Sequence, residues 1–125
     1  MEMSDADFEN IIAEAMDTLP ERFLEHAKNV AVVWDYDPSP EQRIKQKLSP
    51  YQTLFGLYEG IPMTQRGSNY NLVLPDKITI FKNPILRASQ DLKAVKYQVK
   101  HTLWHEIAHH YGLDHDRIHE LEDQE

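Results

Sequence analysis

Three histidines near the end of the chain have the residue type and the spacing of a metal site. His105 and His109 are four positions apart, which places two imidazoles one turn apart on the same face of a helix. Gly112 can take a positive φ without steric penalty, so we expect it to end that helix and to let His115 approach the same ion. Three neutral imidazoles leave a fourth tetrahedral position open, which is typical of catalytic rather than structural zinc.

Glu106 directly follows the first of these histidines. A carboxylate in that place can act as general base toward a metal-activated water, as in helical H-E-x-x-H sites of metallopeptidases. The motif therefore predicts one zinc ion bound by His105, His109 and His115, with hydrolysis of peptide bonds as the reaction. Nickel, cobalt and iron also accept imidazole ligands, so zinc is the expected metal but is not specified by the residues alone.

Three further residues are candidates for contacts with an oxyanion or with substrate. His101 precedes His105 by one helical turn and lies near the same face. Tyr58 and Tyr111 carry phenols, which can donate a hydrogen bond to a developing oxyanion. The alternative for each of the three is an ordinary packing or surface position.

Composition limits the class of protein. The chain has 125 residues, which suits a single domain over residues 1–125. Its net charge of −8 argues against nucleic acid or an anionic membrane as a partner. The expected partner is a peptide or protein substrate. The sequence predicts no oligomeric state. The absence of cysteine excludes disulfides and thiolate ligands. The acidic first residues contain no apolar run, so a cytoplasmic location is expected.

The chain is short for an enzyme that must build both walls of a cleft. The alternative function is therefore a non-catalytic module that binds zinc for stability and holds or regulates peptides.

A long helix over residues 89–111 is expected to carry the metal motif, with Ser89 as its N-cap. Its expected core stripe is Leu92, Val95, Val99, either Thr102 or Leu103, and Ile107, with Trp104 as a further anchor. A second amphipathic helix is expected over residues 4–19, capped by Ser4. Residues 21–28 and 41–48 are predicted as short helical or irregular connections. Strands are expected over residues 30–34 (buried), 53–58, 70–74 and 77–81, where Asn83 and Pro84 end the last one.

Residues 105–115 resemble the extended zinc signature of the metzincin peptidases, and the wider chain is similar to small bacterial zincin-like metallopeptidases. Residues 54–62 and 74–81 also carry that second resemblance, which implies a minimal zincin-like α+β fold. In that fold a small mixed sheet packs on an N-terminal helix and on the long zinc-binding helix. The chain departs from the metzincins because no methionine follows Met63.

The third ligand position is a second point of departure. Members of the small zincin-like family often carry an acidic residue there, whereas this chain has His115 flanked by Asp114 and Asp116. His115 is favoured because its spacing from Gly112 matches the signature, and either carboxylate is the alternative ligand.

Overall fold

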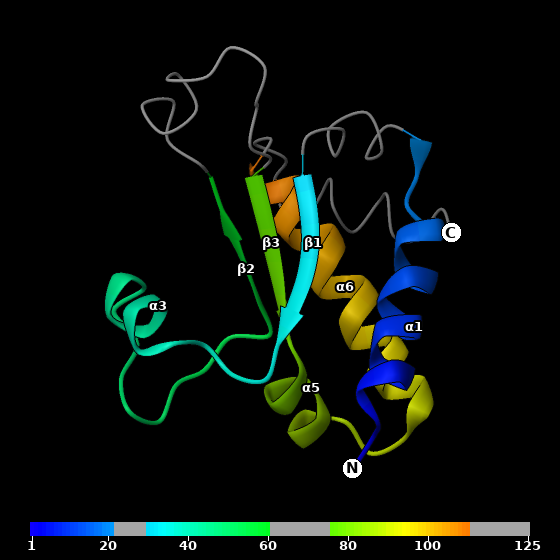
Figure 1. Cartoon of the computed structure of the whole chain (residues 1–125), viewed down its shortest axis with the longest axis horizontal. Helices are drawn as coiled ribbons and strands as arrows, with labels where there is room; N and C mark the ends of the chain where they lie inside the picture. Colours follow the sequence, from blue (N-terminus) through cyan, green and yellow to red (C-terminus); the bar gives the residue numbers. More distant parts are fainter. Residues whose placement is uncertain (22–29, 61–75, 111–125) are drawn as a thin grey trace.

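The computed structural model describes residues 1–21, 30–60 and 76–110 (Figure 1). In chain order its elements are α1 Asp5–Asp17, β1 Val30–Asp35, α3 Pro40–Lys45, β2 Gly56–Glu59, β3 Asp76–Phe81, α5 Lys82–Ala88 and α6 Leu92–His110. Most of the connection expected over residues 21–28 and the whole strand expected over residues 70–74 lie outside the described residues.

The described strands form one mixed sheet in the order β1-β3-β2. β1 runs parallel to β3, with Val30 opposite Asp76, and β2 runs antiparallel to it, with Tyr58 opposite Ile78. The central strand β3 is the most deeply buried of the three, since Ile78 and Ile80 are fully shielded from solvent. β1 was expected to be a buried strand, but Val33 is 41% exposed, because it points to the face opposite Val32 and Trp34, which pack against the core.

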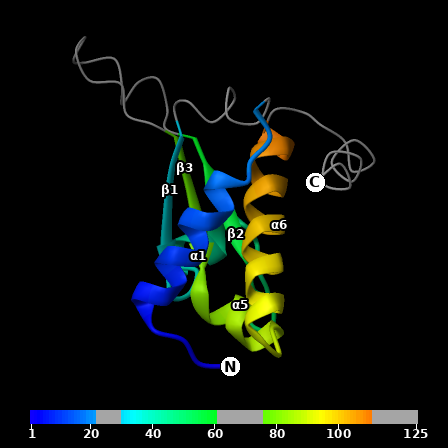
Figure 2. The same cartoon turned by 90° about the vertical axis from the view of Figure 1, so that its right-hand side faces the viewer.

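Helices α1 and α6 both lie on one face of the sheet, as the two perpendicular views show (Figures 1 and 2). Their apolar stripes meet the inner face of β3, and together they form a single core. The core side chains of α1 are Phe8, Ile11, Ile12 and Ala15, and those of α6 include Val95, Val99, Leu103, Trp104 and Ile107. The expected α+β fold, with a small sheet against an N-terminal and a long C-terminal helix, is confirmed.

Local sequence explains where α1 and α3 begin. Ser4 accepts a hydrogen bond from the backbone N–H of Asp7, so it is the N-cap of α1 as expected. α3 is the short helical turn that was one of two alternatives for its segment. It begins with a capping box, in which Ser39 and Gln42 each accept a hydrogen bond from the other's backbone N–H.

The segment between β3 and α6 differs from the expectation. Pro84 was expected only to end the preceding strand, but it lies in the first turn of α5, where a missing N–H costs no helical hydrogen bond. Ser89 donates its hydroxyl to the carbonyl of Ile85 and so closes α5 instead of starting α6. The carboxylate of Asp91 accepts a hydrogen bond from the N–H of Ala94 and caps α6.

Leu92 was expected in the core stripe of the long helix, but it is 49% exposed because it lies at the first residue of α6, beyond the covered part of the helix. The stripe begins one turn later, at Val95. Within the described ranges, no helix has both the length and the hydropathy needed to cross a bilayer.

Candidate active site

His105 and His109 lie on the same face of α6, near the end of its described part. Their ring centroids are 5.6 Å apart and their planes differ by 29°. With a zinc–nitrogen distance of about 2.0–2.1 Å, two imidazoles on one tetrahedral ion have ring centres about 5 Å apart. The observed separation fits that arrangement, so this pair can supply two of the ligands.

The third ligand cannot be placed from the described part of the chain. Across residues 1–21, 30–60 and 76–110, no three acidic or histidine side chains are grouped so as to hold an ion. This follows from the position of the candidates, because His115, Asp114 and Asp116 lie outside those ranges. Gly112, which was expected to turn the chain back, lies outside them as well.

Glu106 is held against strand β2. Burial of its carboxyl group raises the pKa of Glu106 to about 7, and a hydrogen bond from the backbone N–H of Tyr58 opposes part of that rise. A carboxyl group with a pKa near neutrality can both take up and release a proton at neutral pH. The hydrogen bond also fixes where this carboxyl group lies relative to the sheet.

The alternation of backbone bonds explains why Tyr58 can make that contact. The N–H of Phe81 donates to the carbonyl of Phe55 over 2.8 Å, on the inner side of the β2–β3 pair. In an antiparallel pair the next residue directs its backbone groups outward and the pattern then repeats. Gly56 and Tyr58 therefore direct theirs away from β3, toward the side from which Glu106 contacts Tyr58.

A cleft of about 320 Å³ lies between this strand and α6. One wall is made by residues 53–56, which lead into β2, and the other by His101, Thr102, His105 and Glu106 of α6. The cleft thus brings His105, an expected zinc ligand, and Glu106, the expected base, together beside the outer edge of β2.

The sequence model of the zincin-like metallopeptidases matches residues 27–125 of this chain, which is most of its length. This chain belongs to the zincin-like metallopeptidases. The resemblance inferred from its motifs is therefore confirmed at the level of the family.

A solved structure described as a conserved hypothetical protein from Thermus thermophilus has a similar fold, with a TM-score of 0.56. The two share 16% sequence identity, and the similarity covers 86% of this chain and 94% of that one. At that identity the likeness concerns the fold alone. A comparison with curated proteins finds no match.

The candidate oxyanion or substrate contacts of this zincin-like chain are His101, Tyr58 and Tyr111, and they differ in their surroundings. His101 lines the cleft, and its ring centroid is 4.0 Å from that of His105. Tyr58 contacts Glu106 through its backbone, while its hydroxyl group donates to a carboxylate oxygen of Asp76 over 2.9 Å. The expected role of the Tyr58 phenol at an oxyanion therefore has a competing partner. Tyr111 lies outside the described residues.

Sequence reasoning missed the backbone contribution of Tyr58 and the role of Gly56. A glycine inside a strand is typical of either a bulge or a close backbone approach, and the structure shows the second. An added β-carbon on Gly56 would lie 2.5 Å from Cγ2 of Thr102, so only glycine lets α6 pack this closely on β2. Nothing in the sequence marked the N–H of Tyr58, because every residue but proline has one.

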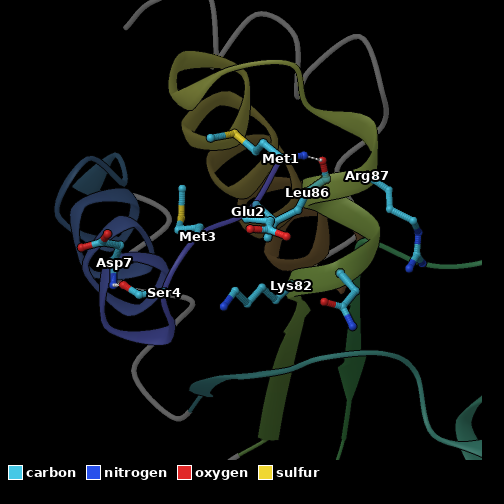
Figure 3. A pocket seen from close by; sticks show the side chains of 9 residues that line it. Met1, Glu2, Met3, Ser4, Asp7, Lys82, Leu86 and Arg87 are labelled. Carbon is cyan, nitrogen blue, oxygen red and sulfur yellow. Dashed lines mark hydrogen bonds between the residues drawn. The ribbon is translucent and has the colours of Figure 1, made fainter.

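Two pockets that are larger than this cleft lie away from the metal motif of residues 105–115. The first, of about 720 Å³, lies between the N-terminal residues and α5 (Figure 3). Its two basic side chains already have acidic partners, since Lys82 pairs with Asp5 and Arg87 with Asp37, and Figure 3 shows them extending in different directions. The second, of about 580 Å³, is a mainly apolar groove between α1 and β1. Neither contains a residue of the metal motif.

Proposed function

We propose that this zincin-like protein is a zinc-dependent peptidase that hydrolyses peptide bonds with Glu106 as general base. His105 and His109 would hold the ion together with His115, as expected from its spacing. The observation that carries the proposal is the meeting of His105 and Glu106 with the outer edge of β2 in one cleft.

The reaction needs a proton acceptor beside the attacking water. A carboxylate has more acceptor sites than the one used by the N–H of Tyr58, so Glu106 can be held in place and still take a proton. Glu106 would accept that proton as the water attacks the peptide carbonyl, and then deliver it to the leaving amine. Zinc, when bound, supplies Lewis-acid chemistry, since it lowers the pKa of water to about 7 and polarises a carbonyl group.

An extended peptide would bind along the outer edge of β2 as an added strand. The edge offers the outward-directed backbone groups of Gly56, which lines the cleft together with Leu54 and Phe55. Main-chain hydrogen bonds would fix the direction of the peptide, and the apolar side chains beside them would contact alternate side chains of the substrate. The substrate class is therefore an extended peptide or an exposed protein segment.

The test is Glu106→Gln, with Glu41→Gln as the matched control at an exposed position of α3. Zinc-loaded wild-type protein should cleave members of a broad peptide library. Loss of a general base should reduce the rate by about 10²–10⁴-fold in Glu106→Gln, with zinc content unchanged at about one ion per chain. Glu41→Gln should match the wild type in both respects.

If zinc-loaded wild-type protein cleaves no peptide of the library, the peptidase proposal fails and the non-catalytic zinc module takes its place. If Glu106→Gln cleaves as fast as the wild type, the assignment of the base is wrong even though the chain is a peptidase.

A further inference from the structure

A row of aromatic rings extends along α6 from His105 and His109, the two expected zinc ligands, toward the start of the helix. It contains Tyr97, His101, His105 and His109, at four-residue intervals that place them on one face of the helix. Successive ring centroids are 5.5, 4.0 and 5.6 Å apart, and successive planes differ by 18°, 41° and 29°. Each ring of the row therefore lies next to the ring one turn away.

The shortest step of the row joins His101 to His105. Their 4.0 Å separation is shorter than the spacing of about 5 Å for two imidazoles on one tetrahedral ion. His101 is thus placed to pack against the ring of His105 rather than to share a metal with it. The Nε2 atom of His105 is buried, so neighbouring atoms cover this side of the ring.

Tyr97 supports His101 from the other side. The two rings are nearly parallel, with planes 18° apart, although Tyr97 itself is 58% exposed. An exposed tyrosine adds little to a core, but a stacked one limits the rotamers open to its neighbour. Tyr97 therefore contacts His101, and His101 in turn contacts His105, the expected metal ligand.

We propose that His101 is a positioning residue, whose ring, supported by Tyr97, fixes the orientation in which His105 meets the metal. A ligand held in one rotamer loses less conformational entropy when the ion binds. Groups that orient a ligand by hydrogen bonding, without touching the metal, typically change metal affinity by 10–100-fold, and we expect a ring packed on the ligand to act in the same range. The proposal rests on the metal site of the proposed function but does not require turnover.

The test measures Zn²⁺ affinity by competition with a chromophoric chelator, and the ligand field by the absorption spectrum of the Co²⁺-loaded protein. His101→Ala should lower Zn²⁺ affinity at least tenfold and alter the cobalt spectrum. His101→Phe keeps a ring in the same place, so its affinity should stay within about threefold of the wild type. Unfolding of the metal-free variants by urea shows whether each one folds.

Two further variants examine the support from Tyr97. Tyr97→Ala should weaken Zn²⁺ binding less than His101→Ala does, because it acts on His105 only through His101. Lys93→Ala, an exposed change one turn earlier on α6, is the matched control and should leave affinity unchanged.

The proposal is overturned if His101→Ala binds Zn²⁺ as tightly as the wild type. It is also overturned if His101→Phe loses as much affinity as His101→Ala, because then the imidazole nitrogens and not the ring are needed. Failure of the metal site itself would be seen separately, since His105→Ala would then leave Zn²⁺ binding intact. A protein that binds Zn²⁺ as expected but cleaves nothing would contradict the proposed peptidase and leave this inference standing.

Discussion

Gly56 and Thr102 bring strand β2 and helix α6 closer together than two ordinary side chains would allow. A β-carbon on Gly56 would lie 2.5 Å from the methyl group of Thr102 and 3.2 Å from the carbonyl oxygen of Thr79. Thr102 lies one turn before Glu106, so this contact sets the width of the cleft at the point where the expected base is held.

Gly56→Ala should therefore destabilise the protein and impair the site. Overpacking of this kind typically costs about 1–3 kcal/mol in the free energy of unfolding, which a urea titration measures. Removal of the opposing methyl group by Thr102→Ser should restore part of that loss in the double variant, because the shortest clash is with this methyl group. Thr102→Ser alone serves as the reference for the double variant. A Gly56→Ala protein as stable as the wild type would show that the two elements separate at no cost.

Zinc should stabilise the folded protein through His105 and His109. A ligand that binds only the folded state adds about 2.7 kcal/mol when its free concentration is 100 times its dissociation constant. Thermal unfolding with and without Zn²⁺ should show this gain in the wild type and in Lys93→Ala. His109→Ala removes one donor of the pair and should lose the gain, and a His109→Ala protein that keeps it would exclude His109 as a ligand.

The carboxylate of Asp5 should contribute stability that depends on pH. Lys82 donates to it over 2.7 Å and the hydroxyl of Tyr36 over 2.6 Å, and these two bonds hold the pKa of Asp5 below its usual 3.8. A carboxyl group with a lowered pKa stabilises the fold fully above its unfolded value, and this contribution is lost as pH falls through the folded value.

The measurement is the difference in melting temperature between wild type and Asp5→Asn as a function of pH. It should be constant above about pH 5 and should shrink below pH 3.8. Tyr36→Phe removes the second donor and so raises the folded pKa of Asp5 toward 3.8, and in that variant the contribution should be smaller and its loss complete at a higher pH. A difference that persists unchanged at pH 2 would contradict this account of the Asp5 carboxylate.

Leu103 and Leu92 provide a matched pair on α6, since both are leucines but only one belongs to the core. Leu103 is fully buried, whereas Leu92 is 49% exposed. Leu103→Ala should lower the free energy of unfolding by about 2–5 kcal/mol, because it removes buried methyl groups and leaves a cavity. Leu92→Ala should change it by less than about 0.5 kcal/mol. Equal losses would mean that the start of α6 is packed more tightly than the structure shows.

Several features followed from the sequence because local physical rules decide them. The spacing of His105 and His109 placed both on one helical face, and Ser4 was recognisable as a cap from its hydroxyl group and the acidic turn that follows it. Apolar periodicity predicted the helices α1 and α6 and the three described strands, but not the short helix α5. The errors fell where several local signals coincide, as at Ser89, which closes one helix although a serine there suits the start of the next.

Only the tertiary structure decided what lies opposite the metal motif. The burial that raises the pKa of Glu106, and the N–H of Tyr58 that contacts it, come from packing between segments almost fifty positions apart. Spacing along the chain carries no record of such a pairing, because it depends on which side of the sheet receives the helix. The sequence determined which residues can bind a metal ion and move a proton, and the packing of α6 on β2 decided the cleft in which they would do so.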